Sequence, residues 1–135
     1  MNAFEKLLKL DKGKLDEMPT KEIASKRLTF LLGEGDEVEK VKIRALSSRE
    51  IEYVTEYTTD ANGDVNQRRL IDGNALVCSK AILEPNVRDE ELISHFGARN
   101  AQDLCEKLFQ MEMAAIASEV MELSGIGVNE NDVKN

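Results

Sequence analysis

The hydrophobic pattern changes abruptly at Ser47, and this change constrains the fold more than any other feature of the chain. Before it, Val41, Ile43 and Ala45 alternate with charged residues, a period of two that predicts a strand with one buried face. Ser47 then stands three positions before Glu50, the capping-box spacing in which each side chain satisfies a free backbone N–H group at a helix start. We therefore expect the chain to pass directly from a strand into a helix.

The residues before this strand predict its partner. Residues 21–28 have the character of a strand, residues 29–32 are apolar, and residues 33–37 form a glycine-rich turn. We therefore expect a β-hairpin over residues 21–46. Residues 1–20, which contain helically spaced apolar side chains and then a glycine and a proline, indicate a short N-terminal helix and a linker.

Helical spacing of apolar residues follows the hairpin. The expected helices cover residues 48–58, 66–83, 89–96 and 101–124, with a polar loop at 60–64. Pro85 ends the second of them, because the residue before a proline avoids the helical region, and Gly125 is a natural cap after the last. The predicted fold class is α+β and mostly α-helical, with an N-terminal β-hairpin followed by a small helical bundle.

The expected domain organisation is one domain over residues 21–127, with its helices within 48–125 and a disordered tail at 128–135. The net charge of −8 disfavours nucleic-acid binding, which depends on Lys and Arg at the phosphates, and disfavours acidic membrane surfaces. The N-terminus lacks the apolar stretch of a signal peptide, and no segment approaches the length of a membrane helix. We expect a cytoplasmic protein whose acidic surface suits a protein partner.

Residues that could carry chemistry have a simpler structural explanation in each case. Cys78 and Cys105 lie among apolar residues, where a free cysteine acts as a small hydrophobic side chain. His95, the single histidine, has no positioned acid–base partner in its pattern. We expect no catalytic residue and no enzyme activity.

A calcium loop is suggested by Asp60, Asn62 and Asp64, which match its first three ligand positions. The required glycine and bidentate glutamate are replaced by Val65 and Ile71, so an ordinary Asx turn is the better interpretation. We expect no metal and no cofactor.

A basic stripe of Lys40, Lys42 and Arg44 could contact nucleic acid. We favour instead the solvated face of an edge strand, where charges prevent sheet-to-sheet aggregation.

The last predicted helix has an apolar arc wider than one core face requires. Phe109 and Leu123 belong to the core side, whereas Met111, Ala114 and Met121 lie on the flank. Methionine is flexible and common on adaptable binding surfaces, so these three are the candidate partner-binding residues. Burial of the helix on most sides explains the same pattern equally well.

The order of several local patterns resembles the XkdN-like tail assembly chaperones of tailed phages and prophages, over roughly residues 20–127. The residues concerned are EIASKRL at 22–28, VKIRALSSREI at 41–51, ILEPN at 82–86, DEEL at 89–92, FGA at 96–98 and MELSG at 121–125. This chain departs from the family pattern before the last helix, where Gln110 and Met111 stand in place of the usual glycine.

The resemblance implies a non-catalytic role in building a phage tail. Such proteins bind the long, helical tape measure protein, keep it soluble, help to recruit tail tube subunits, and are absent from the finished virion. The implied place of action is the cytoplasm of the infected or lysogenic host, and self-association is a further expectation. The alternative is a small acidic adaptor or regulatory protein that binds some other protein.

Overall fold

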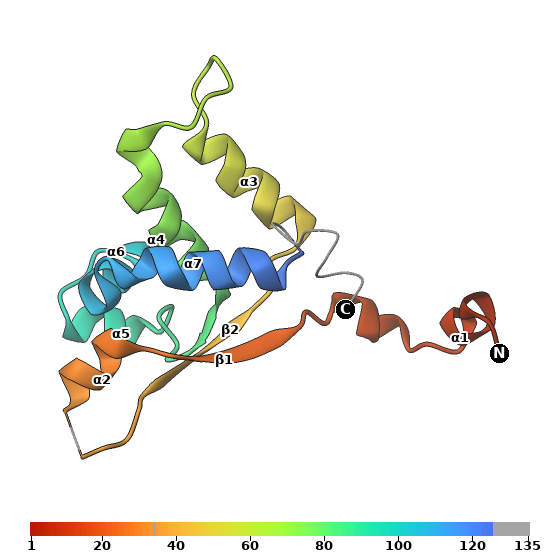
Figure 1. Cartoon of the computed structure of the whole chain (residues 1–135), viewed down its shortest axis with the longest axis horizontal. Coiled ribbons are helices and arrows are strands. Elements are labelled where there is room, and N and C mark those ends of the chain that lie inside the picture. The colour runs from red at the N-terminus through yellow and green to blue at the C-terminus, as the bar shows by residue number, and fades with distance from the viewer. Residues whose placement is uncertain (34, 126–135) are drawn as a thin grey trace.

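The computed structural model describes residues 1–33 and 35–125. This part of the chain contains seven α-helices, two short 3-10 helices and a three-stranded antiparallel sheet (Figure 1), which confirms the predicted fold class. In chain order the elements are α1 (Ala3–Leu8), η1 (Lys12–Asp16), β1 (Thr20–Ala24), α2 (Lys26–Leu32), β2 (Lys40–Arg44), α3 (Ser48–Thr58), η2 (Gln67–Arg69), α4 (Leu70–Ala81), β3 (Ile82–Glu84), α5 (Glu90–His95), α6 (Ala101–Phe109) and α7 (Glu112–Leu123).

The sheet has the strand order β1-β2-β3, so β2 is its central strand. Val41 and Ile43 of β2 are fully buried on one face, as their alternation predicts, and they lie opposite Ile23 and Lys21 of β1. The helices cover this apolar face. Helix α4 packs against α3, α6 and α7, and α7 also contacts β2, which places α4 at the centre of the core.

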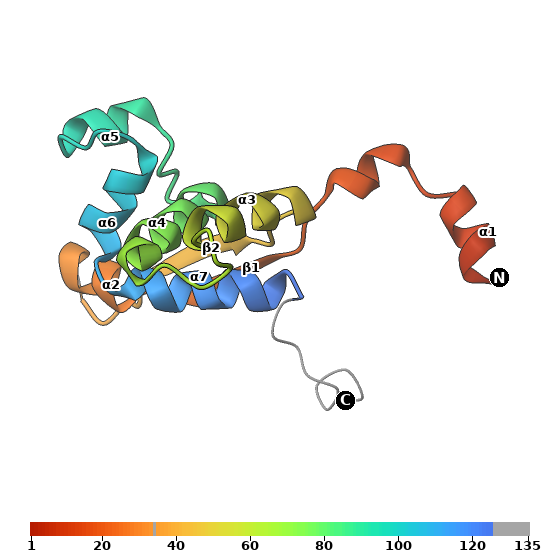
Figure 2. The same ribbon diagram turned by 90° about the horizontal axis from the view of Figure 1, so that it is seen from above.

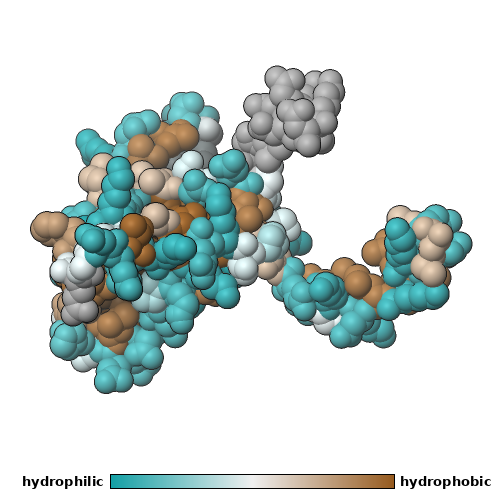
Figure 3. Space-filling model, turned by 60° about the horizontal axis from the view of Figure 1, so that its bottom comes forward, coloured by the Kyte–Doolittle hydropathy of each residue, from teal (hydrophilic) through white to brown (hydrophobic). Residues whose placement is uncertain are grey.

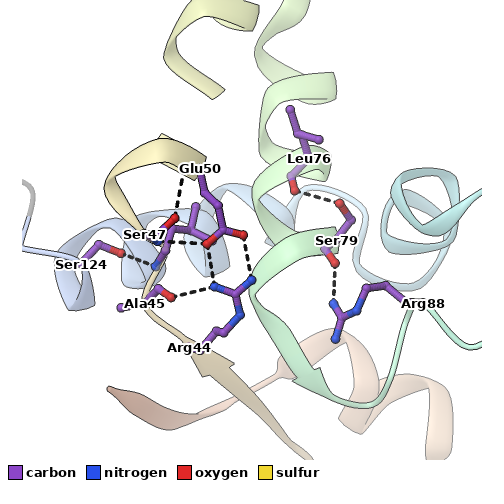
Figure 4. Close-up of polar contacts among 9 residues, drawn as sticks. Arg44, Ala45, Ser47, Glu50, Leu76, Ser79, Arg88 and Ser124 are labelled. Atoms are coloured by element: carbon purple, nitrogen blue, oxygen red, sulfur yellow. Dashed lines mark hydrogen bonds and ion pairs between the residues drawn. The ribbon is translucent and has the colours of Figure 1, made fainter. Parts of the chain in front are cut away.

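The predicted capping box at the start of α3 is present, and Figure 4 shows how it is tied to the sheet. Ser47 Oγ accepts from the Glu50 N–H (3.2 Å), and Glu50 Oε1 accepts from the Ser47 N–H (3.0 Å). Arg44, the last residue of β2, also donates to both carboxylate oxygens of Glu50, each at 2.8 Å. This two-bond contact holds the pKa of Glu50 at about 2, so the carboxylate stays charged well into the acid range.

Glu50→Gln should therefore cost stability at neutral pH and much less in acid. A carboxyl group whose pKa is lowered from its ordinary 4.5 to about 2 stabilises the fold above pH 4.5, and this contribution is lost as the pH falls toward 2. We expect a loss of roughly 1 kcal/mol in the free energy of unfolding near pH 7, since the pair is partly solvated. Urea unfolding of the wild-type and variant proteins at neutral and acid pH measures this difference in stability. An equal loss of stability at the two pH values would mean that Glu50 acts through packing.

The strand predicted for residues 21–28 is wrong in its second half. Strand β1 ends at Ala24, and the hairpin connection contains helix α2. The physical reason is local capping: Ser25 Oγ accepts from the Leu28 N–H (3.1 Å), and Gly33 closes the helix in the left-handed conformation (φ 55°). The β1–β2 pairing itself is antiparallel and in continuous register.

The helix predicted for residues 66–83 is also shorter in the structure. It starts at Leu70 after the 3-10 turn η2 and ends at Ala81, because Ile82 already has extended backbone angles (φ −74°, ψ 119°). Residues 82–84 form β3, a third strand that was not predicted from the sequence. Pro85 follows directly and explains why the helix cannot continue.

The interpretation of the basic stripe as an edge-strand face is wrong, because β2 lies between two other strands. Lys42 is paired across the sheet with Glu22 on one side and Glu84 on the other, and Arg44 binds Glu50. Carboxylates therefore lie beside Lys42 and Arg44, whereas Lys40 lies opposite Ala24, so two of the three positive charges in the stripe have negative neighbours.

The last predicted helix, 101–124, is two helices in the structure. Gln110 interrupts it with a positive φ of 53° and ψ of −135°, and α6 and α7 run in different directions on either side (Figure 2). Gly125 does cap α7 with a φ of 93°, as predicted. The break turns α7 so that Ile116 and Val120 reach the core beneath α4.

Gln110→Gly should stabilise the domain by about 1 kcal/mol. A side chain in the left-handed region is strained, and glycine removes that strain although its unfolded state is more flexible. Gln110→Ala is the matched control, because it keeps a Cβ atom and should give no gain. Thermal unfolding of the wild-type protein and the two variants measures the change in stability. A loss of stability in the glycine variant would contradict a strained Gln110.

The tail predicted to be disordered at 128–135 lies outside the described residues. Within residues 1–33 and 35–125, no helix is both long enough and apolar enough to cross a membrane.

Candidate partner-binding surface

Helix α2 is the element around which the candidate surface is built. Its N-terminus is held by a carboxylate from the far end of the chain, that of Glu112 at the start of α7. The oxygens of this carboxylate accept from Ser25 Oγ (2.5 Å) and from the backbone N–H groups of Lys26 (2.8 Å) and Arg27 (3.2 Å). A negative group at a helix N-terminus satisfies free N–H donors and complements the helix dipole. Glu112 therefore fixes α2 beside the break between α6 and α7.

A second contact holds the middle of α2. Arg27 Nε donates to the backbone oxygen of Leu108 in α6 at 3.3 Å, and its guanidinium lies 5.9 Å from the centre of the Phe30 ring. This is within the range of a cation–π interaction. The arginine thus restrains Phe30 on the outer side of α2.

Exposed apolar side chains occur both on α2 and at the helix break. They are Phe30, Leu31 and Leu32 of α2 and Met111 at the break, and we call these four residues the kink patch. All four are exposed, with Phe30 75% and Met111 77% accessible. Figure 3 shows hydrophobic residues in several separate areas of the body and along the N-terminal segment. Exposed apolar clusters of this kind mark interaction sites.

The three predicted binding residues are placed differently from one another. Met111 is exposed at the break, and Ala114 is exposed one turn later on α7. Met121 lies on the same side of α7 as Ala114, seven residues on, but it is half-buried and packs against the core. Met111 and Ala114 are therefore accessible to a partner, whereas Met121 is mainly a packing residue. Their role in binding stays a prediction.

The α2 side chains of the kink patch were not among the predicted binding residues, because residues 29–32 were interpreted only as an apolar segment within the predicted hairpin. A signal for the helix does exist. Ser25 and Gly33 bracket seven residues, as an N-cap and a left-handed C-terminal residue do. Read as a helix, this segment would have shown more apolar side chains than one buried face can use.

Neither thiol has the setting of a nucleophile. Cys78 and Cys105 are fully buried in the core, and burial raises the pKa of both, that of Cys105 to about 12. A thiol with such a pKa is almost entirely protonated near neutral pH. His95 is exposed at the end of α5, with its ring edge-on to that of Phe96 and the ring centres 4.8 Å apart.

The loop at residues 60–64 is an Asx turn. Asp60 Oδ1 accepts from the backbone N–H groups of Asn62 (2.9 Å) and Asp64 (3.1 Å), which is the hydrogen bonding of such a turn. No group of three or more metal-binding side chains occurs within the residues that the structure describes.

Exposed apolar residues fixed by polar contacts, on a small acidic chain, are typical of proteins that bind other proteins. The chain belongs to the family of phage XkdN-like tail assembly chaperone proteins, whose family model matches residues 4–135, nearly the whole length. Members of this family act with other phage tail proteins during tail assembly, and the match confirms the resemblance found in the sequence.

A solved structure is similar in fold. The crystal structure of the protein yqbn has a TM-score of 0.60 to this chain, with 12% sequence identity, and the match covers 93% of this chain and 97% of that chain. At this identity the likeness shows the fold alone. No significant match was found among curated proteins.

Proposed function

We propose that this chaperone binds the tape measure protein of its phage, keeps it soluble until the tail tube encloses it, and helps to recruit tail tube subunits. The observation that carries the proposal is the exposed kink patch on an acidic member of a tail assembly chaperone family. A tape measure protein presents apolar helical stripes before it is enclosed. An apolar patch can cover such a stripe in a helix-in-groove mode, and the net charge of −8 keeps the complex soluble.

The proposed place of action is the cytoplasm of the infected or lysogenic host, with the chaperone absent from the mature virion. The small acidic adaptor considered above shares the charge but lacks support from the family match, which favours the chaperone role.

Co-expression with the tape measure protein of the same phage tests the proposal. We expect the tape measure protein to be insoluble alone and to co-purify in soluble form with the chaperone. Phe30→Glu with Met111→Glu should abolish this rescue, because two charges would be placed in the apolar contact. Phe96→Glu is the matched control, since Phe96 is an exposed aromatic outside the kink patch.

Two outcomes would contradict the proposal. If the wild-type proteins never associate, the tape measure protein is not the partner. If the kink-patch variant rescues solubility as well as the Phe96 control does, binding occurs elsewhere on the surface. Circular dichroism of each variant shows that the fold is intact.

A further inference from the structure

Strand β1 has one side without a neighbouring strand. The strand order β1-β2-β3 places it at an edge of the sheet, and Figure 1 shows it at the margin of the body, below α7. The backbone N–H of Ala45 donates to the oxygen of Pro19, and that of Ser25 to the oxygen of Glu39. These two bonds fix the phase of the β1–β2 ladder, in which the odd-numbered residues of β1 bond to β2. The even-numbered residues therefore point their N–H and C=O groups away from the sheet.

The free edge is formed by Thr20, Glu22 and Ala24. All three residues are exposed, and their backbone groups have no backbone partner outside the β1–β2 ladder within residues 1–33 and 35–125. An inward-facing charge can protect such an edge from strand addition, but Lys21 is neutralised by Glu119 at 2.8 Å. A row of alternating donors and acceptors is matched by another extended backbone. The edge is therefore suited to the addition of a strand.

A hollow lies beside this edge, between β1 and α7. It has a volume of about 600 Å³. Its apolar lining is formed by Ile23, Ala24, Ala115 and Ile116, and its charged lining by Lys26, Glu112 and Glu119. Ile23 is only half-buried and lies on the inner face of the sheet, on the side of this hollow. A strand added to β1 would place its own inward side chains over the hollow.

We infer that the added strand is β1 of a second copy of this chain. The two strands run antiparallel about a twofold axis and join the two sheets into one continuous sheet, which gives a closed dimer. This edge is separate from the kink patch, so the inference does not depend on the proposed partner.

Charge selects the register of the two strands. A twofold axis perpendicular to the sheet can pass beside Lys21, Glu22 or Ile23, and each choice places that residue directly opposite its own copy. The first two place like charges opposite each other, which is destabilising. The third forms a pair of Ile23 side chains. Because this pair is not hydrogen-bonded, its side chains approach closely, and they close the hollows of both copies.

The outer face of the sheet gains opposite charges in the same register. Glu22 then lies between Lys42 of its own chain and Ala24 of the second copy. Beyond Ala24 comes Lys40 of that copy. Neither Glu22 nor Lys40 forms an ion pair within the described part of one chain. Two strand spacings, about 10 Å, separate these residues, and their long side chains can meet over the small alanine.

The mass of the full-length protein in solution, measured by light scattering over a range of concentrations, tests for the dimer. We expect a dimer that dissociates on dilution, because two short strands bury less surface than a stable dimer interface. Glu22→Pro should be monomeric, since it removes an N–H group that points away from β2 and leaves the β1–β2 bonds in place. Glu22→Ala is the matched control. It keeps the N–H group, so it should still dimerise, with a dissociation constant raised several-fold.

Cysteine cross-linking tests the register. Ile23→Cys should form an intermolecular disulfide under mild oxidation, because the Cα atoms of such a pair lie about 4.5 Å apart, a distance that a disulfide spans. Lys21→Cys and Glu22→Cys are the controls. Both positions are more exposed than Ile23, yet they should cross-link more slowly. The native Cys78 and Cys105 are fully buried and do not compete.

Three outcomes would overturn the inference. The first is a wild-type protein that stays monomeric at its highest soluble concentration. The second is a Glu22→Pro variant that remains dimeric while circular dichroism shows an intact fold. The third is cross-linking at position 21 or 22 that is as fast as cross-linking at position 23.

Discussion

Glu112→Ala should lower the free energy of unfolding by roughly 2–4 kcal/mol. The substitution removes one charged acceptor from three donors at the start of α2. Ser25 is only 1% exposed, and in the variant its hydroxyl group no longer has Glu112 as an acceptor. The backbone N–H groups of Lys26 and Arg27 lose the same acceptor. Because α2 carries most of the kink patch, the same variant should also weaken tape measure binding under the proposed function.

Glu119→Ala on the same helix is the control for this prediction. Glu119 binds Lys21 at 2.8 Å, but both side chains are exposed, so its loss should cost less than about 1 kcal/mol. Glu112→Gln keeps one acceptor oxygen and should fall between the two. Chemical denaturation of the four proteins gives the ranking, and equal losses in the two alanine variants would show that Glu112 does not hold α2.

Gly73→Ala should destabilise the domain by about 1–3 kcal/mol, although alanine is the better helix former. Gly73 is buried where α4 crosses α3, and a Cβ atom there would lie 2.4 Å from Cγ2 of Thr58. Thr58 cannot easily turn aside, because its hydroxyl donates to the backbone oxygen of Val54 at 3.1 Å. Alanine would therefore push α3 away from α4.

Thr58→Ser provides the matching rescue. Serine lacks the Cγ2 methyl group but keeps the hydroxyl, so the double variant should be more stable than Gly73→Ala alone. Thermal unfolding of both single variants and the double variant measures this coupling. If the two effects simply add, the Thr58 methyl group is not what excludes a side chain at position 73.

The elements with local signals were predictable from sequence. Strand β2 and the start of α3 were predicted because alternation and a capping box are both encoded within about a dozen residues. Strand β3 was not predicted, because three residues are too few to show an alternating hydrophobic pattern. Its pairing with Ile43 also joins residues that are far apart in the sequence.

The helix break at Gln110 could not be predicted, because the residues around it have the spacing of a continuous helix. Phe109 and Met113 are four residues apart, a spacing that suits one continuous helix, and glutamine has no preference for positive φ. Of the candidate surface, Met111 was predicted and is exposed, whereas Phe30 was not predicted. The caps Ser25 and Gly33 indicate helix α2 locally, but the bonds that hold α2 to Glu112 and Leu108 join distant segments, which no sequence pattern displays.

These distant contacts also have a consequence for synthesis. Lys21 and Glu119 are 98 positions apart, Ser25 and Glu112 are 87 apart, and Leu46 and Ser124 are 78 apart, so the first strand and helix of the body are held by the last. A ribosome releases β1 and α2 long before α7, and loops of this length are slow to close. Helix α2 is therefore fixed in place only after α7 has been synthesised, so a shorter nascent chain does not present the kink patch in its final arrangement.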